Sequence, residues 1–330
     1  MTALLRRVAV LLLAALLAGA GPAQAKTDGF AAWKETFARK LKKQGFDQPA
    51  VELFLASAVY LDKPIQAQKR QPEKIIRFTD YRRNLLTPER IVTGRKLLSD
   101  YHQFYSETGE RYGLEPQLLV ALWGIESSYG RIMGKHPIIA SLASLAYAGK
   151  RRDFFEKQLV AAVRIAARGD MPVERMTGSW AGAMGHYQFI PTTFEAFAVD
   201  GDGDSRRDLC GSYADAAASA GNYLHSLGWQ RGDLRIHPLE PARARAIYKP
   251  RQKPTFQPAS HWVRAGLLAP GVADGAARFK LVAVDDGRSG YFLVAPGFDR
   301  LREWNRSTYF ALAVMLLAEQ VAAGGGGINS

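Results

Sequence analysis

Residues 116–130 read PQLLVALWGIESSYG, and every other expectation about this chain is arranged around them. Proline is well placed at the first position of a helix, where its missing N–H leaves no bond unmade. The residues that follow are apolar on nearly every side of a helix, and a helix without a polar face is a buried one. The stretch therefore predicts a buried helix that ends close to the Ser-Ser-Tyr-Gly turn at 127–130.

This helix carries one ionisable side chain, Glu126, in its last turn. Burial disfavours the charged form of a carboxyl group, and so does the negative end of the helix dipole. Both effects raise the pKa, as suits a carboxylic acid that stays protonated near neutral pH and donates a proton. The alternative is a glutamate that points into solvent or pairs with a lysine.

A second unusual stretch, residues 179–191, reads SWAGAMGHYQFIP. Its small residues allow close approach of the backbone, and its aromatic, hydroxyl and amide groups are the types that contact sugar rings. The Gly-Ala portion alone is more typical of a tight crossing between helices. Together with Glu126, the stretch favours a carbohydrate-binding loop.

The remainder of residues 30–227 is mainly helical in pattern, with apolar residues spaced three and four apart. Thr87 and Pro88 form a good helix opening, and the apolar pattern continues to Gly109, which predicts one helix over this range. Similar patterns predict further helices over 154–168, 213–227 and 309–322.

The composition of the sequence changes between residues 228 and 300, where several prolines disfavour helices. Residues 280–284 and 291–295 flank a polar turn and are predicted to pair as a β-hairpin. The predicted fold is mainly α (α+β), with a helical core over 30–227, a small β-containing insertion over about 228–300 and a closing helix over about 307–322. Residues 324–330 are expected to form a disordered, glycine-rich tail.

Residues 1–25 have the pattern of a secretory signal peptide. Arg6 and Arg7 precede an apolar run over 8–18, and the segment ends in Ala-Gln-Ala. The apolar run is too short to span a bilayer, and no cysteine lies near the cleavage point to carry a lipid. The mature chain, residues 26–323 plus the tail, is thus expected to be periplasmic, and soluble rather than lipid-anchored.

The composition is that of a globular protein, with 47% hydrophobic and 23% charged residues, and it excludes disorder over the whole chain. The single cysteine, Cys210, cannot form an intrachain disulfide. A net charge of +13 points to an anionic partner. For an exported protein this indicates the cell wall or anionic lipid rather than nucleic acid.

The chain resembles the lytic murein transglycosylase B family of bacterial cell-wall enzymes. Residues 123–130 are similar to the catalytic segment of that family, and residues 181–191 to its second signature, Ala-Gly-Ala-Met-Gly-x-x-Gln-Phe-x-Pro. Residues 304–309, WNRSTY, match a third motif that usually begins with tyrosine. The resemblance extends over roughly residues 30–321.

The resemblance implies a lysozyme-like domain that cleaves the β-1,4 bond between N-acetylmuramic acid and N-acetylglucosamine. Glu126 would act as the single general acid and base, and the muramoyl C6 hydroxyl would close a 1,6-anhydro ring. An internal nucleophile removes the need for the second carboxylate that most glycoside hydrolases use. No cofactor is expected for this chemistry.

The resemblance also implies a set of substrate contacts. Ser179 and Gln188 would line the cleft beside Glu126, while Tyr223 and Asn305 would hydrogen-bond the sugar. Two further tyrosines, Tyr81 and Tyr147, are candidates for stacking or hydroxyl contacts, and packing in the core explains each equally well. Trp304 and Phe310 stand at positions that are often tyrosine in the family, so two hydroxyl groups are missing near the third motif.

An acidic loop follows the second signature, with Asp200, Asp202 and Asp204 at alternate positions. This is the first half of an EF-hand-type loop, whose carboxylates suit Ca²⁺. Ser205 replaces the usual turn glycine, and Asp215 is the candidate for the closing carboxylate. The family's calcium loop supports a structural Ca²⁺ here, and a solvated acidic turn is the alternative.

Two other functions remain open at this stage. A muramidase that uses water would need a second essential carboxylate, and a non-catalytic peptidoglycan-binding scaffold would not need Glu126 at all. The expected partners are peptidoglycan glycan strands, with other cell-wall enzymes as a further class. Nucleic-acid binding is suggested only by charge.

Overall fold

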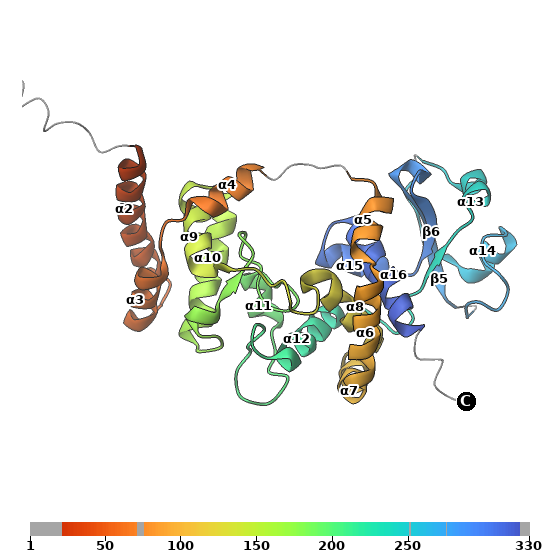
Figure 1. The fold of residues 1–330 in the computed structure, drawn as a ribbon, viewed down its shortest axis with the longest axis horizontal. Helices are drawn as coiled ribbons and strands as arrows, with labels where there is room; N and C mark the ends of the chain where they lie inside the picture. Colours follow the sequence, from red (N-terminus) through yellow and green to blue (C-terminus); the bar gives the residue numbers. More distant parts are fainter. Residues whose placement is uncertain (1–21, 71–75, 251, 275, 324–330) are drawn as a thin grey trace, which may run out of the picture.

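The computed structural model describes residues 22–70, 76–250, 252–274 and 276–323. The predicted signal segment falls almost entirely before this range and the predicted tail entirely after it, so both lie outside the described residues. Figure 1 shows helices α2 and α3 at one end of the molecule and a small sheet with α13 and α14 at the other. None of the helices in the described ranges is long and apolar enough to cross a membrane.

The described residues form mainly helices, together with a few short strands. The helices are α2 (Pro22–Lys43), α3 (Gln48–Ser57), α4 (Asp62–Arg70), α5 (Phe78–Leu85), α6 (Pro88–Asp100), α7 (His102–Tyr112), α8 (Pro116–Ser127), α9 (Ile138–Ala148), α10 (Arg152–Ala167), α11 (Pro191–Phe197), α12 (Tyr213–Ser226), α13 (Pro241–Ile247), α14 (Ala259–Arg264), α15 (Gly297–Trp304) and α16 (Thr308–Ala322). The strands are β1 (His136–Pro137), β2 (Thr177–Gly178), β3 (Ile236–Pro238), β4 (Gln257–Pro258), β5 (Arg278–Val284) and β6 (Gly290–Val294).

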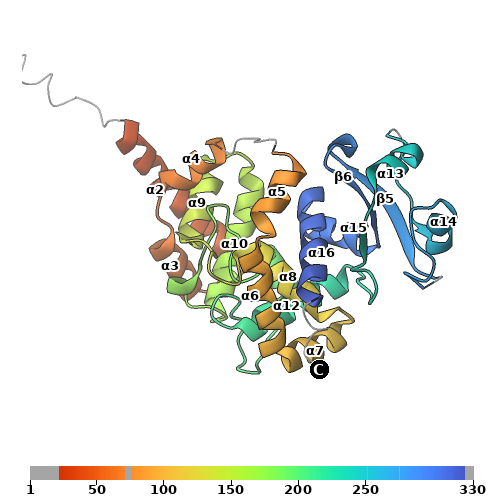
Figure 2. The same ribbon diagram turned by 45° about the vertical axis from the view of Figure 1, so that its right-hand side comes forward.

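The predicted buried helix is α8, and every side chain from Leu118 to Gly124 is buried. Helix α16, which is also buried from Phe310 to Ala318, packs along it, and α6, α7 and α12 cover the remaining sides. Figure 2 shows α8 enclosed among these helices. Burial of each leucine stabilises the folded state by about 2 kcal/mol. The buried leucines of α8 therefore make a large contribution to the stability of the core.

The helix expected between Thr87 and Gly109 is instead two helices, so that prediction was wrong. The Thr87 hydroxyl does cap the first one, accepting a hydrogen bond from the Arg90 N–H. The backbone leaves the helical conformation at Tyr101, with φ −111° and ψ 30°. Helix α6 packs against α8 and α16, whereas α7 packs against α8 and α12. One straight helix could not pack against both α16 and α12. These tertiary contacts therefore break the helix that the apolar pattern predicts.

The predicted hairpin is confirmed, because β5 and β6 pair antiparallel with Val282 opposite Phe292. It lies at the centre of a four-stranded sheet in the order β3-β6-β5-β4. Successive residues of a strand point to opposite faces. Phe292 and Val294 accordingly join the main core, whereas Tyr291 and Leu293 join a second, smaller core with residues of α13 and α14.

The prolines of this region do not exclude helices, contrary to the sequence-based expectation. Helix α13 begins at Pro241, and α14 follows directly after Pro258. A proline at a helix start costs no hydrogen bond, so only the interior of a helix is closed to it. The division of the chain at about residues 228 and 300 stays a prediction.

Helices α6 and α8 both approach the ring of Tyr129, the residue that follows α8 in the Ser-Ser-Tyr-Gly turn. An added Cβ at Gly94 would lie 2.5 Å from the Tyr129 hydroxyl, and one at Gly124 would lie 2.7 Å from its ring. The hydroxyl donates a hydrogen bond to the Arg90 carbonyl at 2.8 Å. The glycines therefore leave the space that the tyrosine fills.

Gly124→Ala is expected to lower the free energy of unfolding by about 1–3 kcal/mol, because the new methyl group overlaps the Tyr129 ring. Helix propensity alone would have the opposite effect and stabilise the alanine variant by up to about 1 kcal/mol. Urea unfolding followed by circular dichroism measures the difference. Ala56→Ser, on the exposed side of α3, is the control. A more stable Gly124→Ala protein would contradict the packing described here.

Candidate active site

The end of α8 is held in a conformation that few side chains adopt. Ser128, Tyr129 and Gly130 all have positive φ angles, of 51°, 60° and 79°. Left-handed conformations of non-glycine residues cost roughly 1–3 kcal/mol each and persist only where surrounding contacts enforce them. Arg90 supplies one such contact, since its Nη2 donates to the Ser128 hydroxyl at 2.8 Å. The helix thus ends at Ser127, one residue after Glu126.

The carboxyl group of Glu126 lies in a largely apolar environment. The side chain is partly buried, and among the described residues one hydrogen bond reaches it: the indole Nε1–H of Trp304 donates to Oε1 at 2.8 Å. Removal of water raises the pKa of Glu126 to about 7, and the hydrogen bond from Trp304 opposes part of that rise. Glu126 therefore carries a proton in a large share of molecules near neutral pH.

Trp304 belongs to an aromatic wall formed by helices α11, α12 and α15 and by the loop of the second signature. Its ring lies 4.9 Å from that of Tyr223 on α12 and 5.3 Å from that of Phe189, and Tyr223 in turn stacks on Phe197 at 4.4 Å. The structure therefore brings Tyr223, predicted from the resemblance, close to Glu126 through Trp304. Sequence reasoning missed Trp304 itself, because the third motif indicated only a lost tyrosine hydroxyl.

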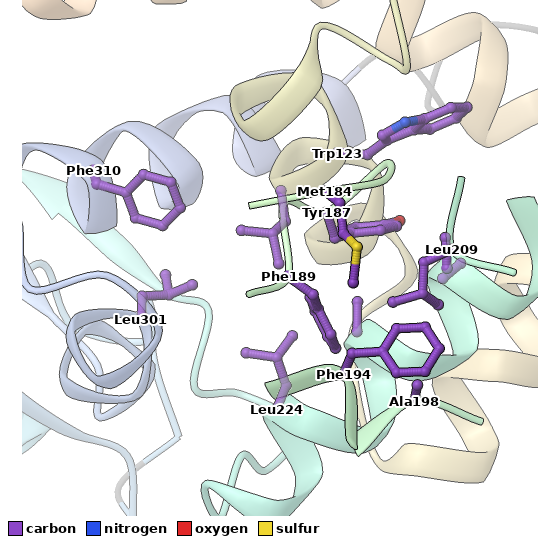
Figure 3. Packing of buried hydrophobic residues seen from close by; sticks show 14 of the residues in the cluster. Trp123, Met184, Tyr187, Phe189, Phe194, Ala198, Leu209, Leu224, Leu301 and Phe310 are labelled. Carbon is purple, nitrogen blue, oxygen red and sulfur yellow. The ribbon is translucent and has the colours of Figure 1, made fainter. Parts of the chain in front are cut away.

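The loop of the second signature docks against the end of α8. The Trp123 indole N–H donates to Nδ1 of His186 at 3.0 Å, and the Ser127 hydroxyl donates to the His186 carbonyl at 2.6 Å. Burial lowers the pKa of His186, so its ring stays neutral and accepts that bond. Figure 3 shows Met184 and Phe189 of this loop in the core, with Trp123 above them. Two stretches far apart in sequence thus form one unit.

Ser179 and Gln188, predicted to line the cleft, make hydrogen bonds within this unit. The Ser179 hydroxyl accepts from the Ala183 N–H at 3.0 Å. The Gln188 amide donates to the Met133 carbonyl at 3.1 Å and to the Gly185 carbonyl at 2.9 Å. Both side chains are partly buried, and both help to shape the loop.

The remaining predicted contacts lie at different distances from Glu126. Tyr81 on α5 is near enough for the charge of Glu126 to raise its pKa, in addition to the larger effect of burial. Asn305 directly follows Trp304, is exposed, and accepts a hydrogen bond from the Ser307 N–H. Tyr147 instead lies against Phe30, with 5.5 Å between ring centres. The other position that is often tyrosine in the family, Phe310, is buried in the core.

Asp285, in the turn between β5 and β6, ties the sheet to the helices around Glu126. Its carboxylate accepts hydrogen bonds from the Phe78 N–H at 3.0 Å, from the Tyr309 hydroxyl and from the Ser289 hydroxyl. Burial alone would raise the pKa of Asp285, but these hydrogen bonds outweigh it and lower the pKa. The contacts fix the start of α5, and hence the place of Tyr81. The sequence indicated only a turn here.

Three of the four predicted metal ligands gather in the acidic loop. Oxygens of Asp200, Asp202 and Asp204 lie within 4.8 Å of one another. Ser205 adopts a φ of 68°, so the loop makes its sharp turn without the usual glycine. These hard oxygen donors fit Ca²⁺, which they would hold together with backbone oxygens and water.

Asp215, predicted to close the metal site, is not part of this group. Its side chain is fully buried at the start of α12. One carboxylate oxygen accepts from the Gly201 N–H at 2.7 Å and the other from the Asp208 N–H at 2.6 Å. In this structure Asp215 anchors the two ends of the loop.

The raised pKa of Glu126 predicts how stability depends on pH. The native protein binds more protons at this site than the unfolded chain between pH 4.5 and about 7. Stability from this site is therefore complete below pH 4.5 and falls as the pH rises toward 7. Glu126→Gln removes the ionisation and should be more stable than the parent at pH 8 by up to about 3 kcal/mol, and nearly equal at pH 4.5.

Chemical unfolding at the two pH values measures this difference, with exposed Glu35→Gln on α2 as the control. An equal effect of Glu126→Gln at both pH values would contradict a raised pKa at this site.

Known proteins resemble this chain over nearly its full length. The family model described as transglycosylase SLT domain matches residues 29–319. Membrane-bound lytic murein transglycosylase B of Escherichia coli K12 is 28% identical over 295 residues, which cover 86% of this chain and 81% of that protein.

Solved structures agree in fold. SltB3 from Pseudomonas aeruginosa, in complex with NAG-NAM-pentapeptide, matches with a TM-score of 0.80 and 34% identity, covering 90% of this chain and 80% of that one. The Escherichia coli lytic transglycosylase Slt35, in complex with calcium, matches with a TM-score of 0.74 and 28% identity, covering 88% and 93%. The predicted lysozyme-like, mainly helical fold is confirmed, and the chain belongs to the transglycosylase SLT domain family of lytic murein transglycosylases.

Proposed function

We propose that this chain is an exported lytic transglycosylase that cleaves the β-1,4 bond between N-acetylmuramic acid and N-acetylglucosamine in peptidoglycan. The observation that carries the proposal is the carboxyl group of Glu126, withdrawn from water, with a pKa raised to about 7 and a single indole donor on one oxygen. A general acid works best when its pKa lies near the working pH. The family of the chain supports the substrate class.

Glu126 would serve as acid first and as base second. In the first half, its proton passes to the glycosidic oxygen while the bond from that oxygen to C1 breaks. In the second half, the carboxylate takes the proton of the muramoyl C6 hydroxyl while O6 bonds to C1. The proton count on Glu126 is restored, no water is consumed, and the product carries a 1,6-anhydro ring.

The electrostatics of Glu126 favour this route over hydrolysis with two carboxylates. Its raised pKa has one cause, desolvation, and no neighbouring carboxylate of the described residues contributes to it. Glycosidases that use water rely on a second acid flanking the scissile bond. The complex of SltB3 with NAG-anhNAM-pentapeptide is consistent with the same chemistry in a relative.

The substrate contacts belong to the proposal as well. Tyr81 and Tyr223 are the best supported. The charge of Glu126 raises the pKa of Tyr81, and the Tyr223 ring packs against the indole that donates to Glu126. Ser179, Gln188 and Asn305 follow from the family resemblance. Tyr147 lies in a separate aromatic cluster, so it would meet the substrate at a greater distance from the scissile bond.

Export to the periplasm is proposed from residues 1–25 and from the chemistry of the substrate. The net charge of +13 suits a polymer whose peptide stems are anionic. Glycan strands are therefore the expected partner.

Mass spectrometry of fragments released from purified peptidoglycan tests the reaction. The mature chain is expected to release muropeptides one water lighter than hydrated products, and Glu126→Gln is expected to release none. Glu319→Gln on α16 is the control, because it makes the same exchange at an exposed glutamate. Hydrated reducing ends would instead establish a muramidase, and binding without release by the parent would establish a scaffold.

We further propose that the acidic loop binds a structural Ca²⁺. The support is the three gathered carboxylates, whose mutual repulsion a cation would relieve, and the calcium complex of the relative Slt35. The loop leads into α12, which carries Tyr223, so the ion would stabilise one wall of the site without taking part in the chemistry.

Calcium is expected to raise the melting temperature of the protein, and a chelator to lower it. At a free concentration of 100 times the Kd, the gain in stability is about 2.7 kcal/mol. Asp202→Asn should abolish the response, whereas Asp274→Asn in another exposed turn should retain it. A calcium response that survives Asp202→Asn would place the ion elsewhere.

A further inference from the structure

The hydrogen bond between Trp304 and Glu126 has a chemical direction that cannot reverse. Indole Nε1–H is a donor only, so Oε1 of Glu126 must be the acceptor. In a protonated carboxyl group, the carbonyl oxygen accepts hydrogen bonds and the hydroxyl oxygen donates. An acceptor at Oε1 therefore places the proton on the other oxygen, Oε2.

We propose that Trp304 is a positioning residue that selects Oε2 as the proton-carrying oxygen of Glu126 in both halves of the reaction. The inference rests on the proposed role of Glu126 as the acid and base. Within the described part of the chain, Oε2 receives no hydrogen bond from any residue, so it is the oxygen left for the substrate. When Glu126 is ionised, Oε1 still accepts the hydrogen bond from Trp304. The proton from the C6 hydroxyl therefore binds to Oε2.

The packing of the indole keeps this bond in place. Trp304 ends α15, and the helix is anchored by Phe298 and Leu301, which are both buried. The indole ring lies against Tyr223 on one element and Phe189 on another. A ring held on two sides cannot swing its N–H away, so the donor is pre-organised before the substrate arrives.

The identity of the side chain matters because tryptophan stands where tyrosine is usual in the resembling family. A phenol both donates and accepts, so a tyrosine here would tolerate the proton on either oxygen of Glu126. The indole removes that freedom.

The groups that face Glu126 are uncharged near neutral pH, so they do not titrate together with it. The titratable group facing it from α5 is Tyr81, whose own pKa is raised, so it stays neutral at pH 7. From α15 it faces the uncharged indole. No ion pair to Glu126 occurs in the described ranges.

Trp304→Phe tests the proposal, because it keeps an aromatic ring in the stack and deletes the donor. We expect kcat to fall by roughly tenfold at pH 6 with KM little changed, as for the loss of one hydrogen bond to a charged group. The bond from Trp304 favours the ionised form of Glu126, so its loss should also move the basic limb of the pH profile to higher pH. Trp304→Tyr restores a donor, so the basic limb of its pH profile should move back toward that of the parent protein.

A separate readout needs no turnover. The Trp304 indole N–H resonance in ¹⁵N-labelled protein should titrate with a midpoint near pH 7, and Glu126→Gln should abolish that titration. If Trp304→Phe does not fold, replacement of Trp304 by 3-benzothienylalanine, which has the shape of tryptophan without the N–H, provides the same test.

The outcomes separate the two proposals. An unshifted basic limb together with an equal loss of rate at every pH would show that Trp304 only supports the fold, and would overturn the selection of Oε2. Full activity without the N–H would overturn it as well. A parent protein that releases no anhydro product would overturn the proposed function instead, while the titration of the indole resonance would still report on the hydrogen bond.

Discussion

A carboxyl group withdrawn from water is the constraint around which this molecule is organised. Glu126 lies at the end of a buried, apolar helix, and desolvation alone accounts for the rise of its pKa to about 7. Such a site is stable only if the group can be neutral and if its few polar contacts are well made. The fold meets the first condition by burial and the second with one indole donor.

Much of the surrounding structure serves to hold that helix end in place. Tyr129 fills the space left by two glycines, and its hydroxyl bonds to the backbone of α6. Arg90 bonds to the turn from the same helix, and the loop of the second signature closes over the other side. These contacts sustain consecutive left-handed residues. Glu126 is therefore positioned by elements that come from three distant parts of the sequence.

Asp215 is a buried carboxyl group whose surroundings differ from those of Glu126. Burial also raises the pKa of Asp215, but two short hydrogen bonds from backbone N–H groups oppose the rise. Donors of this kind favour a carboxylate, so Asp215 suits a structural role under the acidic loop. Glu126, with a single donor and an open oxygen, suits proton transfer. The number and direction of the donors distinguish the two roles.

The sequence by itself determined the buried helix, its terminal glutamate, the hairpin and the acidic loop, because these depend on local pattern and short motifs. Only the tertiary structure decided that Trp304 bonds to Glu126, that Asp215 anchors the loop rather than joining the three acids, and that α6 and α7 are separate helices. The reason is physical: a periodic pattern reports which side of an element is apolar, whereas a hydrogen bond across 178 residues depends on where the packed elements meet.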